Sequence, residues 1–265
     1  MRSFDEYKQI LALWELGVNK KAISRETGIP RRTVIDCIQQ YGTVENLLVE
    51  SQQAVQPLLP KILTGEIEGD YRTLLETYAY LLGLYLGDGN IVKTRNVYRL
   101  RITLDAKYQQ IIETCIQKLQ LLFPQNQIGT VESYYRGRLS YINVSLYYRH
   151  LPEIFPQHDA GLKHNRKIEL ADWQQRIVDT YQLEFLRGLY HSDGSRFSNI
   201  VNGKDYPRYQ FTNYSDDIRR LFCNTCDCLG LHWTTKQRGK TRETDIFISK
   251  RKDVAFLDAA IGPKS

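Results

Sequence analysis

Two acidic residues, Asp88 and Asp193, occupy equivalent places in a segment that the sequence contains twice. The ten residues at 80–89 read YLLGLYLGDG, and those at 185–194 read FLRGLYHSDG. Two carboxylates brought together near a phosphate are a usual oxygen site for Mg²⁺, which there activates water and stabilises the leaving oxygen of a phosphodiester. The repeat therefore predicts a pair of metal-binding, catalytic acids.

Small residues recur in both copies, at Gly83 and Gly87 and again at Gly188 and Ser192. A spacing of four places them on one helix face, and glycine inside a helix costs roughly 0.5–1 kcal/mol relative to alanine. We therefore expect these two helices, here called the motif helices, to pack closely against each other and so offset that cost.

The expected pairing of the motif helices places their carboxyl ends, and the two acids, side by side. The acids would repel each other and meet the negative ends of two helix dipoles, and bound cations would relieve both effects. The plainer interpretation is that each Asp-Gly pair merely ends a helix with a turn. Two equivalent copies favour the functional interpretation.

The residues after each motif helix predict two strands, a helix, two more strands and a final helix, with one such unit at 71–170 and the other at 171–265. Alternation in the strands gives each sheet an apolar face and a polar, cationic face. A polar face of this kind suits phosphates and groove edges of double-stranded DNA, although a solvated sheet face looks similar. The candidate DNA-binding residues on these faces are Arg99, Arg101, Thr103 and Asn143 in the first unit and Arg208, Gln210 and Thr212 in the second.

Both decapeptides resemble the LAGLIDADG motif of homing endonucleases in a single-chain, duplicated form, and the resemblance covers residues 74–261. It implies an α+β fold in which a pseudo-twofold pair of αββαββα units forms a saddle across DNA. It also implies that Asp88 and Asp193 bind Mg²⁺ for double-strand cleavage. Departures from the motif are Leu82 and Arg187 in place of its first Ala, and Leu86 and His191 in place of its first Asp.

Members of that family place a basic residue near the metals after the last strand of each half. Lys250 and Arg149 are the nearest equivalents here, and Lys250 is the candidate for catalysis. Between the halves a short basic run, 163–167, offers Lys163 and Arg166 as clamps for the DNA backbone, with a solvated linker as the alternative.

An additional small all-α module is expected at 1–41. Helical spacing up to Gly17, a short helix at 20–27 and a third helix beginning near Pro30 resemble a helix-turn-helix, with Gly28 in the turn. Arg31, Arg32 and Thr33 on the third helix are the candidate base and phosphate contacts. Such a face is also compatible with solvation or with binding of a protein. The acidic stretch 42–70 is expected to be a connector, with a short helix at 44–55.

Composition limits the remaining classes. The chain of 265 residues is 42% hydrophobic and 25% charged, with a net charge of +6. It lacks an apolar run long enough for a membrane and the layout of a signal peptide, so we expect a cytoplasmic protein of the bacterial cytosol or nucleoid, a monomer without membrane association. Five cysteines are expected to be thiols. A zinc site at Cys223, Cys226, Cys228 and His232 is disfavoured because a second pair of ligands is missing.

Three functions remain open on these grounds. The first is a sequence-specific, Mg²⁺-dependent DNA endonuclease. The second is a DNA-binding transcriptional regulator on the same fold that does not cut, and the third is a splicing helper that binds structured intron RNA. The two retained acids favour the endonuclease.

Overall fold

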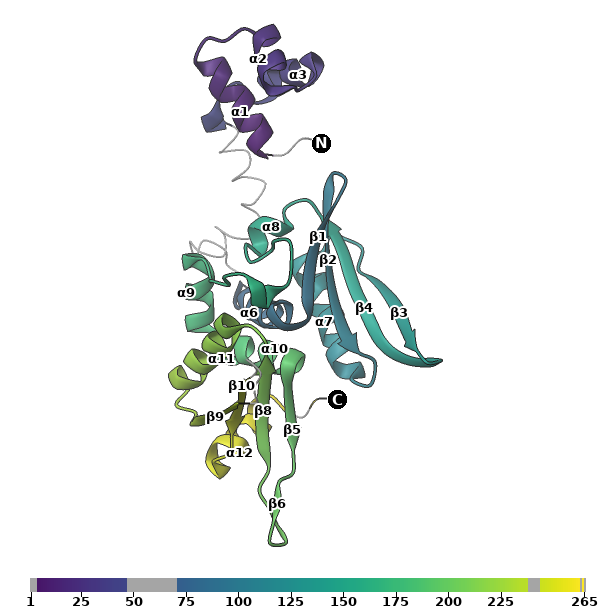
Figure 1. Ribbon diagram of the computed structural model, residues 1–265, viewed down its shortest axis with the longest axis vertical. Coiled ribbons are helices and arrows are strands. Elements are labelled where there is room, and N and C mark those ends of the chain that lie inside the picture. The colour runs from purple at the N-terminus through teal and green to yellow at the C-terminus, as the bar shows by residue number, and fades with distance from the viewer. Residues whose placement is uncertain (1–3, 47–70, 238–243, 263, 265) are drawn as a thin grey trace. The chain divides into compact units, whose positions relative to one another are not determined.

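The computed structural model describes residues 4–46, 71–237, 244–262 and 264 (Figure 1). These belong to two compact units, Met1–Glu68 and Gly69–Ser265, which are treated separately below. The sequence also predicts a hairpin turn at Gly239, between two strands of the second unit, and that residue lies outside the described residues. So do most of the expected helix at 44–55 and of the connector at 42–70.

The first unit contains three helices, α1 (Phe4–Glu15), α2 (Lys20–Thr27) and α3 (Arg31–Tyr41). The Asn19 side chain caps α2, and Gly28 turns the chain toward α3 with a φ of +68°, a conformation that favours glycine. Leu16, which continues the helical apolar spacing of this segment in the sequence, follows the last residue of α1 and is 79% exposed. The core of the unit consists of Ile10, Leu11, Ile23, Ile29, Val34, Cys37 and Ile38.

The second unit begins with the first half of the duplicated fold. In chain order it contains α6 (Tyr71–Asp88), β1 (Gly89–Thr94), β2 (Val97–Asp105), α7 (Gln109–Leu122), β3 (Gly129–Tyr135), β4 (Arg138–Tyr148) and the short α8 (Leu151–Ile154). The strands form an antiparallel sheet in the order β1-β2-β4-β3. α6 is the first motif helix.

A linker with the 3-10 turn η1 (Lys163–Asn165) and the helix α9 (Asp172–Thr180) leads to the second half. That half contains α10 (Gln182–Asp193), β5 (Gly194–Phe197), β8 (Arg208–Asn213), α11 (Asp216–Cys228), β9 (Trp233–Gln237), β10 (Thr244–Ile248) and α12 (Arg251–Ala260). Its sheet has the order β5-β8-β10-β9, and α10 is the second motif helix. An additional hairpin of β6 (Ile200–Val201) and β7 (Lys204–Asp205), not expected from the sequence, extends between β5 and β8.

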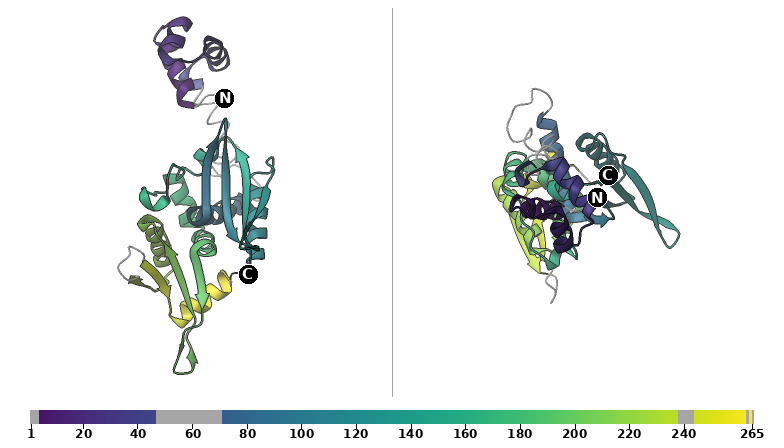
Figure 2. Two further views of the ribbon diagram at one scale, coloured as in Figure 1. Left: turned by 45° about the vertical axis from the view of Figure 1, so that its right-hand side comes forward. Right: turned by 90° about the horizontal axis from the view of Figure 1, so that it is seen from above.

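The expected α+β architecture is confirmed, and the two halves match residue by residue near the motifs. Gly89 pairs with Ile102 in the first sheet, and Gly194 pairs with Phe211 in the second. Ile102 and Phe211 are therefore equivalent, as are Arg101 and Gln210. Figure 2 shows the two sheets extending from the paired motif helices. The alternating apolar residues of β2 and β8 lie in the core as predicted: Leu100, Ile102, Leu104, Tyr209 and Phe211.

A buried polar network attaches the linker to α6. The Tyr78 hydroxyl donates to the Ile154 carbonyl at 2.6 Å and accepts from the Gln174 amide at 2.7 Å. Gln174 in turn bonds to Gln157, whose amide also donates to the Glu169 carbonyl at 2.7 Å. Because buried polar groups are costly when unpaired, this network fixes the course of the linker beside the first motif helix.

Replacing Tyr78 with phenylalanine is expected to destabilise the protein by about 1–3 kcal/mol, because it removes the donor to the buried Ile154 carbonyl and the acceptor of one Gln174 N–H. The measurement is urea denaturation followed by circular dichroism. Tyr147→Phe is the matched control, since that tyrosine is 49% exposed and its hydroxyl can be replaced by water. Equal stabilities of the two variants would contradict the structural role of the network.

Candidate functional site

The motif helices cross so closely that neither central glycine could carry a side chain. A Cβ placed on Gly83 would lie 2.7 Å from the Leu189 nitrogen, and one on Gly188 would lie 2.9 Å from the Leu84 nitrogen. A Cβ on Gly87 would lie 2.5 Å from the Asp193 carboxylate and would also clash with Ser192. The predicted helix packing through Gly83, Gly87, Gly188 and Ser192 is thus present, and it brings the ends of the two helices together.

Asp88 and Asp193 are the last residues of α6 and α10, and both are half-buried. Burial raises the pKa of Asp88 to about 7, and the negative charge of Asp193 is the second contribution to this rise. Burial also raises the pKa of Asp193. The two carboxyls therefore share one partly desolvated place, as the sequence predicted, and each makes ionisation of the site more costly.

The two acids differ in the hydrogen bonds that orient their carboxylates. The Asn213 amide, at the end of β8, donates to Asp193 at 2.8 Å, and its own oxygen accepts from the Ser215 backbone N–H at 2.8 Å. This second bond fixes the amide so that its NH₂ group faces the carboxylate. The equivalent residue of the first half is Leu104, which is buried and has no donor. Sequence reasoning missed Asn213, although a polar residue at an apolar position of the alternating strand was a visible signal.

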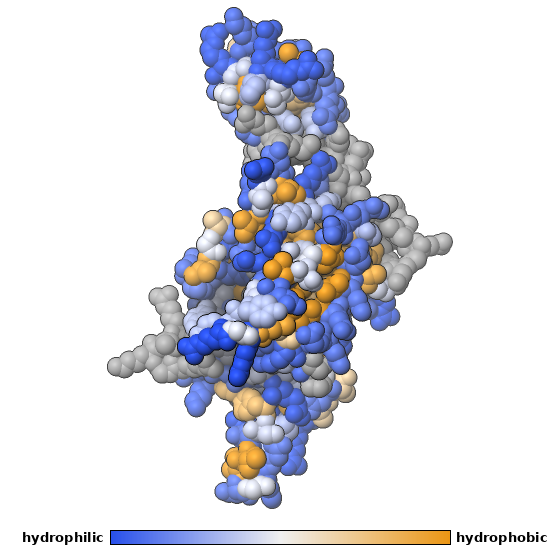
Figure 3. All heavy atoms as spheres, turned by 90° about the vertical axis from the view of Figure 1, so that its right-hand side faces the viewer, coloured by the Kyte–Doolittle hydropathy of each residue, from blue (hydrophilic) through white to orange (hydrophobic). Residues whose placement is uncertain are grey.

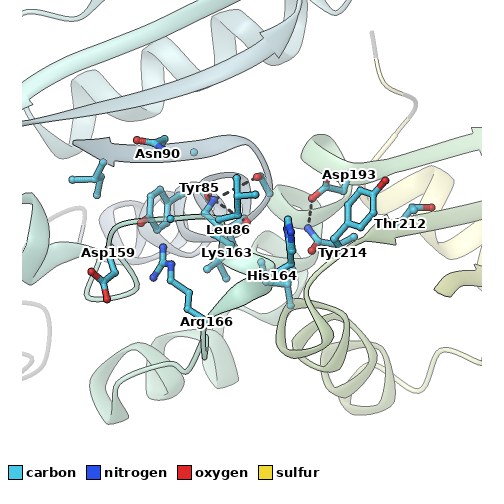
Figure 4. A pocket seen from close by; sticks show the side chains of 17 residues that line it. Tyr85, Leu86, Asn90, Asp159, Lys163, His164, Arg166, Asp193, Thr212 and Tyr214 are labelled. Atoms are coloured by element: carbon cyan, nitrogen blue, oxygen red, sulfur yellow. Dashed lines mark hydrogen bonds between the residues drawn. The ribbon is translucent and has the colours of Figure 1, made fainter. Parts of the chain in front are cut away.

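Two lysines that follow the two halves approach the acid pair. The Lys163 ammonium, on η1, donates to the carbonyls of Leu86 at 3.0 Å and Gly87 at 3.4 Å, and also to Tyr85. Burial lowers the pKa of Lys163 to about 7, against the attraction of both aspartates. Figure 4 shows Lys163 and His164 lying between Tyr85 and Leu86 of the first half and Asp193 and Tyr214 of the second.

Lys264 has the corresponding place in the second half. Its ammonium donates to the Ser192 carbonyl at 2.8 Å, beside the end of α10. Burial lowers the pKa of Lys264 to about 8, while Asp88 and Asp193 raise it. Neither Lys163 nor Lys264 was predicted as a partner of the acids, because both come from irregular segments without periodic signals.

The predicted basic residues, Lys250 and Arg149, lie elsewhere. β10 begins at Thr244, which pairs with Asn213 beside the acids, and runs away from them to Ile248. Lys250 follows on that far side, where it is exposed and its carbonyl starts α12. Arg149 likewise follows the end of β4 that pairs with Tyr98, away from Gly89. The sequence prediction was wrong because it took the first basic residue after each last strand, whereas the chain returns to the acids later.

The prediction that Lys163 and Arg166 clamp the DNA backbone is also contradicted, because both side chains bond to backbone carbonyls of the protein itself. Lys163 is engaged by the helix carbonyls, and the Arg166 guanidinium donates to the Gln157 carbonyl at 2.5 Å. Both side chains are half-buried. In this run the exposed residues are His164, Asn165 and Lys167. The two residues proposed as clamps therefore organise the linker.

The polar face of the first sheet carries the predicted residues in one layer. Arg101 is exposed, and Arg99 lies over the Tyr147 ring at 5.8 Å. Thr103 donates to the Asn143 oxygen at 2.8 Å, so these two side chains are held in place. Apolar residues accompany them, including Val92 and Tyr141, each at least half exposed. Figure 3 shows one face of the molecule, on which hydrophobic side chains gather near the centre and hydrophilic ones surround them.

On the polar face of the second sheet, polar side chains bond to one another. Gln210 donates to Thr212 at 3.1 Å, and Thr212 donates to the buried Asp245 at 2.6 Å. Arg208 is equivalent to Arg99, and within the described residues the buried Nε of each has no hydrogen-bond partner.

In the first unit, Arg31 and Arg32 are exposed at the start of α3, and Thr33 is half-buried. Arg32 forms an ion pair with Asp36 at 3.1 Å on the same helix. The helix start is therefore available to a ligand. Its role in DNA contact remains a prediction.

Cys223, Cys226 and His232 do not form a metal centre. Cys226 is in the core, and His232 donates its backbone N–H to Asp253 and contacts the same carboxylate through its ring. Within the part of the chain that the structure describes, no group of three or more His, Cys, Asp or Glu side chains is placed to hold a metal. All five cysteines are free thiols.

The acid pair has the donor chemistry for a hard cation. Mg²⁺ is commonly held by one or two carboxylates, with water and phosphate oxygens completing its shell, so a dedicated cage of three side chains is not needed. Asp88 and Asp193 supply that minimal set at one place. The two nearby ammoniums oppose it, because they already interact with the same charge.

Comparison with solved structures identifies the architecture of the second unit. I-DmoI in complex with DNA and Mn is 18% identical over 71% of this chain and 97% of that chain, with a TM-score of 0.51. The second unit has the LAGLIDADG fold. A structure of mesophilic variants from the homing endonuclease I-DmoI gives 18% identity, the same coverages and a TM-score of 0.50. The N-terminal LAGLIDADG domain of DUF199/WhiA is 14% identical over 72% of this chain and 83% of that chain, with a TM-score of 0.47.

Likeness at these identities establishes the fold alone. No family model matches the sequence, and no curated protein matches it significantly. Among the described residues, none of the helices combines the length and apolar character needed to cross a membrane.

Proposed function

We propose that this protein binds double-stranded DNA in a sequence-specific manner and cuts both strands in a Mg²⁺-dependent reaction. The observation that carries the proposal is the meeting of Asp88 and Asp193 at the ends of two crossed helices, between two sheets with polar faces. The solved neighbour I-DmoI, which shares this fold, is described in complex with DNA and Mn. From the geometry of the site we infer that this protein binds ligands of the same chemical classes, namely DNA and a divalent cation.

In this proposal each residue has a stated task. Asp88 and Asp193 would hold the cation, which when bound supplies Lewis acidity at the scissile phosphate. Asn213 keeps the Asp193 carboxylate oriented. Arg99 and Arg208, at equivalent positions on the two sheets, would offer guanidinium N–H groups to phosphate oxygens. The helix-turn-helix of the first unit would add contacts to a flanking sequence through Arg31, Arg32 and Thr33.

The proposal is tested with a randomised duplex library. The full chain is incubated with the library and Mg²⁺, and the ends produced are mapped by sequencing. Double-strand breaks at a shared sequence would support the endonuclease. Enrichment of bound duplex without breaks would refute cleavage and leave sequence-specific binding, and a preference for structured RNA over duplex would refute both.

A second candidate, a DNA-binding regulator that does not cut, is favoured by one observation. The Lys163 and Lys264 ammonium groups bond to the carbonyls at the ends of α6 and α10, next to the two acids, and would reduce the repulsion between those acids and DNA phosphates without a metal. The library experiment separates this candidate from the endonuclease, because a regulator enriches a sequence and leaves it intact.

Replacing Arg101 with alanine is expected to weaken DNA binding about tenfold and, if the guanidinium contacts a phosphate, to reduce the salt dependence of binding by about one unit of slope. The reason is that Arg101 is exposed on the polar face of β2. The measurement is fluorescence anisotropy at several salt concentrations with the selected duplex. Arg176→Ala is the control, because Arg176 is also exposed but lies on α9, outside the sheet. Equal losses for both variants would contradict binding through the sheet face.

A further inference from the structure

Asn143 lies in the middle of a chain of three polar side chains on the polar face of the first sheet. The Thr103 hydroxyl donates to its amide oxygen at 2.8 Å, and its amide nitrogen donates to the Ser133 hydroxyl at 2.9 Å. In the sheet, β4 lies between β2 and β3 (Figure 1), so the two partners approach the amide from opposite sides. The plane of the amide is therefore fixed by the protein itself.

These two bonds use half of the hydrogen-bonding capacity of the amide. A side-chain amide has two N–H donors and an oxygen with two lone pairs, so one donor and one acceptor position remain. Because the bonded partners flank the group on both sides, the remaining donor and acceptor lie next to each other on its outer edge. Asn143 is half-buried, so a ligand on the polar face can reach this edge.

An exposed apolar side chain accompanies the amide. Val131 on β3 pairs directly with Asn143 in the sheet register, and 54% of its surface is exposed. In the major groove of DNA, adenine offers an acceptor, N7, next to a donor, the N6 amino group, and its partner thymine offers a methyl group. Guanine offers two acceptors and cytosine a donor, so the donor and acceptor of one amide match adenine best.

We propose that Asn143 and Val131 together select an A·T base pair, Asn143 by two hydrogen bonds to the adenine edge and Val131 by contact with the thymine methyl group. This inference rests on the proposed sequence-specific binding of DNA and does not depend on cleavage. Thr103 and Ser133 are positioning residues, which hold the amide in the plane that the adenine edge requires.

The second half does not repeat this arrangement. Asp245 on β10 is the equivalent of Asn143, because each accepts from the equivalent threonine of the neighbouring strand. Asp245 is buried, and a carboxylate offers acceptors alone. Lys236 pairs with Asp245 where Val131 pairs with Asn143, so the apolar side chain is also missing. We therefore expect selection of this A·T pair on the side of the first half and not at the symmetric position.

The competing explanation is that the three side chains merely satisfy one another inside the sheet, as buried polar groups usually do. Such a chain would contribute to stability, and its loss would weaken the binding of every duplex equally. An amide that contacts adenine, by contrast, changes the preference at one base pair. The coupling between the amide and single atoms of the base distinguishes the two roles.

The experiment starts from the duplex that the full chain selects from the randomised library. Each adenine in turn is replaced by 7-deazaadenine, which lacks the N7 acceptor but still pairs with thymine, and binding is measured by fluorescence anisotropy without divalent ions. At one position we expect the natural chain to bind at least about fivefold more weakly, the lower range of a specific base contact. The Asn143→Ala protein should bind both duplexes equally. If no adenine shows this coupling, the proposal is overturned.

Two further variants define the contact. Asn143→Asp, which is nearly isosteric and serves also where the alanine variant does not fold, should shift the preference at this position from adenine to cytosine, because a carboxylate only accepts. Replacing the opposite thymine with uracil should weaken binding by the natural chain about threefold, the size of one buried methyl group, and leave Val131→Ala unaffected. An unchanged preference for adenine in Asn143→Asp would contradict the proposal.

Asn126→Ala is the matched control. The Asn126 amide also donates within the protein, to the Tyr147 carbonyl at 2.8 Å, but Asn126 precedes β3 and lies outside the sheet. This variant should keep the full sensitivity to 7-deazaadenine, and loss of that sensitivity would overturn the proposal by showing a general effect. If the library yields no selected sequence, the proposed sequence-specific binding fails together with this inference. A selected sequence without coupling to Asn143 refutes this inference alone.

Discussion

Replacing Gly188 with alanine is expected to destabilise the second unit by about 3 kcal/mol or more, enough to lower its unfolding midpoint substantially. The added Cβ would meet the Tyr80 carbonyl and would lie 2.9 Å from the Leu84 nitrogen. Both are backbone atoms of α6, so the methyl group cannot be accommodated by rotation of a side chain. The helices would have to separate, and they carry the core of both halves. Urea denaturation followed by circular dichroism measures the loss.

Gly129→Ala provides the control for this prediction. Gly129 also lies in regular structure, at the start of β3, but a Cβ there would be 3.8 Å from its nearest neighbour, an ordinary contact. We expect a change of less than about 1 kcal/mol, of either sign. A Gly188→Ala protein as stable as the Gly129→Ala protein would show that the motif helices do not cross as closely as described.

The second large effect is expected at the acid pair. Asp88→Asn together with Asp193→Asn should lower the rate of DNA cleavage by at least about a thousandfold, because neither amide can supply the charge that holds the cation. Binding of the selected duplex, measured by fluorescence anisotropy without divalent ions, should remain within a few-fold of the natural chain. The combination separates loss of chemistry from loss of recognition.

Asp172→Asn is a suitable control for the cleavage measurement, since Asp172 is an exposed aspartate in the first turn of α9. It should cut at the natural rate. Cleavage that persists in the double variant of Asp88 and Asp193 would refute a catalytic role for both acids. It would also require the reacting group to be sought elsewhere in the chain.

The sequence predicted those parts of the fold and site that repeat with a regular period. The glycines at 83 and 188 identified the helix crossing, because small residues four apart mark one face and carry a cost that only close packing offsets. The apolar residues at 100, 102 and 104 likewise identified the buried face of β2. The two acids followed from their position at the ends of those helices. These inferences depend on local spacing, which the sequence displays directly.

The remaining parts of the site depend on chain returns that have no period. Lys163 and Lys264 reach the acids from a linker and from the residues after α12, so their partners are set by tertiary structure. Lys250 was wrongly preferred because its distance along the chain was taken for distance in space. Asn213 was the detectable omission, as a polar residue at a position where the equivalent Leu104 is apolar.

The two sheet faces have diverged although their backbones still match. Arg101 of the first half corresponds to Gln210 of the second. A dimer of identical chains would present the same chemistry on both sides, whereas this single chain presents two different surfaces. A duplex lying along both surfaces would therefore have a preferred direction. In a palindromic sequence, only one of the two identical halves could match the surface that it contacts.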